Sequence, residues 1–262
     1  MCMIQHELKR NYKSFLIWAL VTGGCILVFM LIYPEFGDMP ESISSMYAQM
    51  GAFSDAFGLD RIGIETAVGF YGVEGGTMLA LGGSMFAAML GCGMLAKEEG
   101  GHTAEFLYGA AGHRSRVIGA KLAVVFILIT LFSLFCLGCG LLSFVCIGET
   151  VEWGKILLLH GAQWLMCMEI GAACFGISGF LRKNNVGVGI GIAIILYFVN
   201  IFINISDKLD ILKYVTPFYY GDASRVLTDN AISAGAVAGG WSIGLILCCV
   251  GIFHYMRKDL AA

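Results

Sequence analysis

Six long apolar runs constrain this chain more than any other feature of its sequence. An α-helix rises about 1.5 Å per residue, so about 20 apolar residues cross the roughly 30 Å hydrocarbon core of a bilayer. Only 13% of the residues are charged, against about 25% in a typical soluble domain. The chain is therefore predicted to be an all-α polytopic membrane protein with a single transmembrane domain, residues 1–262. The predicted spans are about 15–33, 75–96, 122–146, 156–181, 186–205 and 236–256.

The first run is expected to stay in the protein as its first helix. It follows Lys9, Arg10 and Lys13, and it is longer than the apolar region of a signal peptide, which also needs a small-residue cleavage site. Glycine is frequent inside the later runs, for example at Gly83 and Gly91. Because small residues let membrane helices approach closely, we expect these faces to pack against other helices.

Lys and Arg are divided unevenly between alternate connections, and cytoplasmic loops of membrane proteins are enriched in both. Both termini are therefore predicted to face the cytoplasm, since their side holds eleven of the 16 basic residues: Lys9, Arg10, Lys13, Lys97, Arg114, Arg116, Lys121, Arg182, Lys183, Arg257 and Lys258.

Two connections on the other side are longer than a helical hairpin requires. In the first, apolar residues recur at helical spacing over residues 42–58, which predicts an amphipathic helix at the membrane surface. In the second, residues 206–235, aromatic residues surround Pro217, a pattern typical of side chains at headgroup depth. An ordinary solvated loop is the alternative for each.

The connection between the second and third spans, residues 97–116, is polar at both ends and apolar in its middle. Thr103 can cap a short helix, and Glu105 suits the positive N-terminal end of its dipole. Phe106 and Leu107 give this helix an apolar side. A short helix parallel to the membrane would be a docking element for a soluble partner, and a solvated hairpin explains the pattern equally well.

One acid, Glu169, lies near the middle of the fourth span, where an ionised side chain costs at least about 2.5 kcal/mol. It is a candidate pathway residue that meets a cationic or hydrogen-bonding substrate, together with Gln163 one to two turns away. The alternative is a protonated acid that is hydrogen-bonded between helices. His160, Asn200 and Asn204 are expected nearer the membrane surface.

At residues 98–121 the sequence resembles the type-two ABC exporter permease family, whose members carry an acidic stretch, a Gly-Thr-like pair, an acid, two apolar residues and a basic turn. Two further patches are similar to the family, residues 7–18 before the first span and residues 216–227 before the last. His102 separates Gly101 from Thr103, and Ala111 or Gly112 stands where many relatives have proline. The matching residues are Glu98, Glu99, Gly101, Thr103, Glu105, Phe106, Leu107, Arg114, Ser115, Arg116 and Lys121.

The resemblance implies a six-helix permease in a bacterial cell membrane that exports a peptide, an antibiotic or a lipid-like molecule. It implies two permease chains, identical or different, with the pathway at their interface. It also assigns polar contacts with an ATPase to Glu98, Glu99 and Glu105, and an apolar insert to Phe106 and Leu107. The chain contains no Gly-x-x-x-x-Gly-Lys-Ser/Thr phosphate loop, so ATP and Mg²⁺ are expected in a separate cytoplasmic ABC ATPase.

Two other functions remain open at this point, and neither involves nucleic acid. An ion-coupled secondary transporter would use Glu169 as its proton or ion site, although the two halves show no convincing inverted repeat. An intramembrane metalloprotease would use Glu98, Glu99 and His102, but the sequence lacks a His-Glu-x-x-His pair.

Overall fold

The computed structural model describes residues 2–37, 51–59, 61–101, 113–183 and 185–258. Within them, no strand occurs and six helices are long and apolar enough to cross a membrane, which confirms the predicted fold class. These helices are α1 (Cys2–Gly37), α5 (Gly76–Gly100), α7 (Arg114–Ile147), α8 (Trp153–Ser178), α9 (Val186–Ile205) and α12 (Ala234–Arg257). A short helix, α4 (Ala67–Phe70), and a π-helical turn, η1 (Tyr71–Gly75), run directly into α5.

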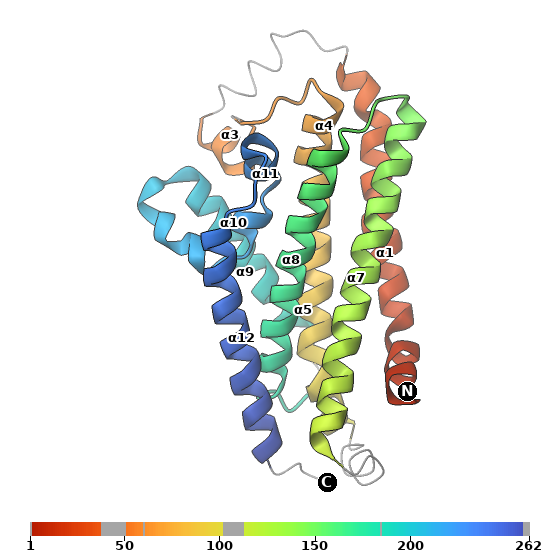
Figure 1. Ribbon diagram of the computed structural model, residues 1–262, viewed down its shortest axis with the longest axis vertical. Coiled ribbons are helices and arrows are strands. Elements are labelled where there is room, and N and C mark those ends of the chain that lie inside the picture. Colours follow the sequence, from red (N-terminus) through yellow and green to blue (C-terminus); the bar gives the residue numbers. More distant parts are fainter. Residues whose placement is uncertain (1, 38–50, 60, 102–112, 184, 259–262) are drawn as a thin grey trace.

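Helices α5 and α8 form the centre of the bundle (Figure 1). In the most apolar part of each, 72% and 67% of the residues are buried, whereas the other four spans reach at most 39%. Helix α1 packs mainly on α7, α12 packs on α8, and α9 packs on α5. The apolar outer faces of α1, α7, α9 and α12 are left for lipid or for another chain.

Glycine allows the close contact between α5 and α8. A Cβ atom on Gly91 would lie 2.6 Å from the carbonyl oxygen of Gly171 and 2.8 Å from the Cβ of Cys174. Gly83 similarly faces Cys167. A larger side chain at these positions would force the two helices apart, so the expected packing role of these two glycines is confirmed.

Helix α1 begins, α5 ends, α7 begins and α12 ends at one end of the bundle, here called the terminal end (Figure 1). The 36 residues of α1 make a rod about 54 Å long, well beyond the thickness of the hydrocarbon core. Residues 7–18, which resemble a lead-in to the first span, are therefore continuous with it in a single helix.

Short helices cover the opposite end of the bundle: α3 (Ala52–Phe57), the 3-10 helix η2 (Asp207–Tyr214), α10 (Phe218–Gly221) and α11 (Ala223–Asp229). Of the predicted amphipathic helix over residues 42–58, only α3 lies among the described residues. The expected headgroup-depth aromatics divide into two groups. Tyr214 is half exposed, but Phe218 and Tyr220 are buried in the core.

Candidate functional site

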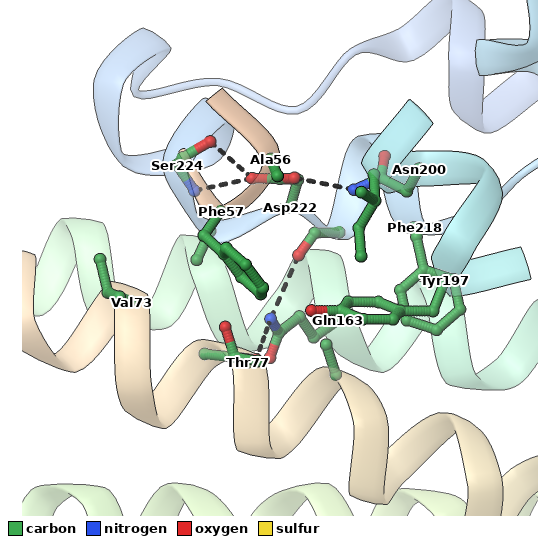
Figure 2. Close-up of a pocket in the computed structure, with 16 residues that line it drawn as sticks. Ala56, Phe57, Val73, Thr77, Gln163, Tyr197, Asn200, Phe218, Asp222 and Ser224 are labelled. Atoms are coloured by element: carbon green, nitrogen blue, oxygen red, sulfur yellow. Dashed lines mark hydrogen bonds between the residues drawn. The ribbon is translucent and has the colours of Figure 1, made fainter. Parts of the chain in front are cut away.

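A small polar cavity lies towards the opposite end of the bundle (Figure 2). Its volume is about 40 Å³, and its wall comes from α3, η1, α5, α8, α9, α10 and α11. Gln163, one of the two predicted pathway residues, lies on one side of the cavity, and Asp222 and Asn200 lie on the other. The Nε2 of Gln163 donates hydrogen bonds to the carbonyl oxygens of Gly76 at 2.9 Å and Gly221 at 3.1 Å.

The carboxylate of Asp222 organises the other side of the cavity. Its Oδ1 accepts hydrogen bonds from the main-chain nitrogen and the hydroxyl of Ser224 at 2.9 and 2.7 Å, which caps the start of α11. Its Oδ2 accepts hydrogen bonds from the side-chain nitrogens of Asn200 and Asn204 on α9 at 2.9 and 3.1 Å. Asp222 therefore joins the last turns of α9 to α11.

His160, Asn200 and Asn204, which are expected nearer the membrane surface, have buried side chains that bond within the bundle. The two asparagines bind Asp222, and the Nε2 of His160 lies 2.7 Å from the hydroxyl oxygen of Tyr71. The sequence signal for the asparagine pair was their spacing of four residues in an apolar run, which puts both on one face of a helix.

Glu169, the second predicted pathway residue, lies in the contact between α8 and α12. It is 4% exposed, and its Oε2 accepts a hydrogen bond of 2.7 Å from the hydroxyl of Tyr220. Gly240 and Gly244 form a notch in α12 that receives its side chain, because a Cβ on Gly240 would lie 2.7 Å from Oε1. Glu169 and Gln163 thus bind consecutive residues of α10, Tyr220 and Gly221, and Glu169 does not line the cavity.

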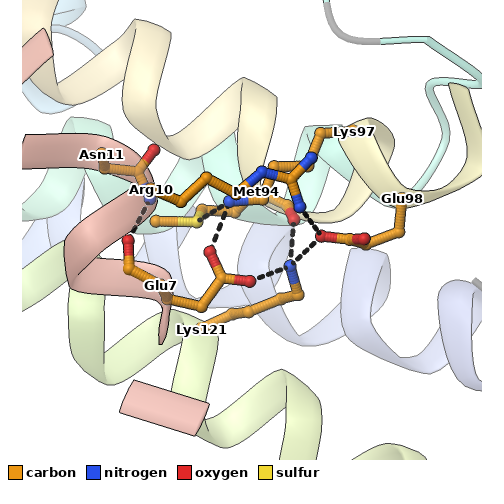
Figure 3. Close-up of polar contacts among 7 residues, drawn as sticks. All are labelled: Glu7, Arg10, Asn11, Met94, Lys97, Glu98 and Lys121. Atoms are coloured by element: carbon orange, nitrogen blue, oxygen red, sulfur yellow. Dashed lines mark hydrogen bonds and ion pairs between the residues drawn. The ribbon is translucent and has the colours of Figure 1, made fainter. Parts of the chain in front are cut away.

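A cluster of five charged residues lies at the terminal end, here called the terminal charge cluster (Figure 3). Glu7 and Arg10 come from α1, Lys97 and Glu98 from α5, and Lys121 from α7. Lys121 is fully buried, and Glu7 and Glu98 are each 2% exposed. The cluster therefore joins three helices that are distant in the sequence.

Lys121 is the centre of this cluster. Its ammonium group has three N–H donors, and its Nζ lies 2.6 Å from Glu7 Oε1, 2.9 Å from Glu98 Oε1 and 3.1 Å from the carbonyl oxygen of Met94. Lys97 also pairs with Glu7, and Arg10 pairs with Glu98 at 2.9 Å. Each carboxylate thus bridges two cations.

The structure places Glu98 and Glu99 inside the protein, although the resemblance assigns them to contacts with an ATPase. Glu98 belongs to the terminal charge cluster, and Glu99 accepts a 2.6 Å hydrogen bond from Lys258, just after α12. The last turn of α5 is therefore anchored to α1, α7 and the end of α12. The other residues of the predicted docking element, Thr103, Glu105, Phe106 and Leu107, lie outside the described residues.

Comparison with known proteins gives one family match. The model of a family described as ABC-2 family transporter protein matches residues 1–260, which include all six spans, the polar cavity and the terminal charge cluster. No curated protein matches the chain.

Replacing Lys121 by Met tests the importance of the terminal charge cluster. The substitution leaves two buried carboxylates without their shared cation, and breaking a buried ion pair in this way costs about 3–5 kcal/mol. We expect a clear fall in the unfolding midpoint of the purified protein in detergent.

The matched control is Lys155→Met, since Lys155 pairs with Glu152 on the surface, where the two side chains are 40% and 51% exposed. Its loss should cost below about 1 kcal/mol. Equal midpoints for the two variants would contradict the role given to Lys121.

Proposed function

The chain belongs to the ABC-2 family of transporter proteins, and from this premise we propose that it is the permease subunit of an ATP-driven ABC exporter. The match over residues 1–260 is the observation that carries this proposal. The six-helix bundle supports it, because the start of α1 and the end of α12 lie at the same end of the bundle. We assign this end to the cytoplasmic side of a bacterial cell membrane, where the eleven basic residues counted above would lie.

Energy for transport would come from a separate cytoplasmic ABC ATPase that binds ATP and Mg²⁺. Two permease chains, identical or related, would form the pathway between them. The apolar outer faces of α1, α7, α9 and α12 offer ample surface for a second chain and for the bilayer. Soluble monomeric proteins rarely expose so large an apolar surface to water.

Coupling would run through the connection between α5 and α7. Phe106 and Leu107 are the proposed apolar insert, Thr103 the helix cap and Glu105 the polar contact with the ATPase. Glu98 and Glu99 would link the docking element to the rest of the bundle, because their carboxylates pair with Lys121 and Lys258. A movement of the docking element would then be passed to α1, α5, α7 and α12 together.

The transport pathway would include Gln163 and Glu169, and the cargo would be a peptide, an antibiotic or a lipid-like molecule. The position of Gln163 in the cavity wall supports its assignment. Glu169 would act through Tyr220, since its carboxylate binds that hydroxyl and is enclosed by α12. Both residues hold α10, so movement of α10 would expose them.

Affinity purification of the tagged chain from its native membrane tests the proposed function directly. We expect a stoichiometric ATPase with a phosphate loop to co-purify. A mock-tagged membrane protein from the same cells is the control. A chain that purifies alone, as monomer or dimer, would instead favour an ion-coupled secondary transporter with Glu169 as its site.

Phe106→Asp tests the docking element. A charged side chain in an apolar contact carries an unfavourable desolvation cost, so we expect ATP hydrolysis to persist in the reconstituted complex while transport is largely lost. Phe106→Leu keeps the apolar contact and should retain transport. If Phe106→Asp leaves the ratio of transport to hydrolysis unchanged, the coupling role is wrong.

Glu169→Gln tests the pathway assignment. The amide keeps the shape of the side chain and an acceptor for Tyr220, but it removes the acid. We expect transport to fall several-fold with little change in the yield of folded protein. Glu152→Gln, which alters an exposed acid at the opposite end, is the matched control. Unchanged transport in Glu169→Gln would leave this acid with only a structural role.

A further inference from the structure

Several hydrogen-bond donors in the wall of the polar cavity are occupied within the protein, and the hydroxyls of Thr77 and Tyr197 also lie in this wall. The side-chain nitrogen of Gln163 donates to two main-chain carbonyls, and that of Asn200 donates to Asp222. The hydroxyl and the main-chain nitrogen of Ser224 also donate to Asp222. These two hydroxyls can accept hydrogen bonds as well as donate them, so the wall offers more acceptors than free donors.

Two acceptors in the same wall have no partner. Gln163 is 1% exposed and Asn200 is 4% exposed, and the amide oxygen of each accepts no hydrogen bond within the described residues. Buried polar atoms are nearly always paired in folded proteins, because an unpaired one loses its hydration without replacement. These two oxygens therefore call for a donor that the described chain does not supply.

The charge of the wall points to the same kind of ligand. None of the ion pairs within the described ranges includes Asp222, whose four hydrogen-bond donors are neutral. Arg225, the basic side chain in its hydrogen-bond network, binds Asn204 at 2.8 Å and lies 4.2 Å from the centre of the Tyr219 ring. The negative charge of Asp222 is therefore left to act on the cavity.

The size of the cavity and the aromatic side chains in its wall narrow the range of possible ligands further. A single water needs roughly 10–15 Å³ of such space, so a cavity of about 40 Å³ admits one small polar group. The rings of Tyr197 and Phe218, which meet edge-on at 5.5 Å, form part of the wall. Aromatic faces attract cations.

From these observations we propose that the polar cavity binds a primary ammonium group. An ammonium group carries a positive charge and three donors and has no acceptor, which matches the unpaired oxygens, the carboxylate and the aromatic wall. A carboxylate or an ionised phosphate would be repelled by the carboxylate of Asp222, and it has no N–H or O–H group to donate to the two amide oxygens. The assignment of this ammonium group to the transported molecule rests on the proposed function. The binding site itself does not depend on that function.

The test uses the purified full chain in nanodiscs and three probes of the same length: butylammonium, 1-butanol and butyrate. The unfolding midpoint is followed against probe concentration at constant ionic strength. We expect a saturable rise with butylammonium alone. In Asp222→Asn and in Gln163→Met, the concentration for half of the effect should rise about tenfold, as expected when one charge-assisted contact is lost.

Ser242→Ala is the control variant, since Ser242 lies on the exposed face of α12, away from the cavity. It should respond like the natural chain. Equal shifts with the three probes, unchanged responses in both cavity variants, or no saturable response at all would each overturn the proposal; the last outcome would mean that the cavity holds only water.

The source of the ammonium is found by repeating the titration in two lipids. If lipid headgroups occupy the cavity, the butylammonium concentration for half of the effect should be higher in nanodiscs of phosphatidylethanolamine than in nanodiscs of phosphatidylcholine. Equal requirements would identify a free amine as the ligand. Because the assay uses the permease chain alone, its result is independent of whether an ATPase co-purifies.

Discussion

The ammonium group of Lys121 sets the arrangement of the terminal end. A buried cation is costly unless its donors are satisfied, and each close partner of Lys121 comes from a different position: Glu7 on α1, and Glu98 and a main-chain carbonyl on α5. These contacts set the positions of the start of α1, the end of α5 and the start of α7 relative to one another. They also join Glu98, which precedes the connection between α5 and α7, to Lys121, which follows it.

The opposite end is held by different means. There, α10 and α11 are tied to the long helices by hydrogen bonds to two acids, Asp222 and Glu169, and by the amide of Gln163. The elements that these contacts hold are only four and seven residues long. The bundle thus combines a terminal end joined by buried ion pairs with an opposite end joined by hydrogen bonds from neutral donors.

The sequence predicts the six spans well, because length and apolarity alone identify a helix that crosses a bilayer. It predicts their ends less well. Glu7, in the part of α1 before the apolar run, pairs with Lys121, which lies 114 residues away, and no local pattern shows this contact. In the sequence, Glu98 and Glu99 look like solvated acids, because their partners Lys121 and Lys258 are also distant along the chain. Gln163 and Glu169 stand out in the sequence as polar residues within a span. Their separation, with one in a cavity and the other in a glycine notch, depends on the packing of α10 and α12.

The π-helical turn η1 has a consequence for the shape of the cavity. A π-helix takes in about one residue more per turn than an α-helix, so the helix before Tyr71 and the helix after Gly75 are out of phase with each other. Cavity-lining residues occur within this turn, at Gly72 and Val73, and in the helix that follows it, at Thr77 and Ala80. In a regular α-helix, residues five apart such as Gly72 and Thr77 lie well apart around the helix axis. The wider π turn brings them towards the same side, so the extra residue lets both contribute to the cavity wall.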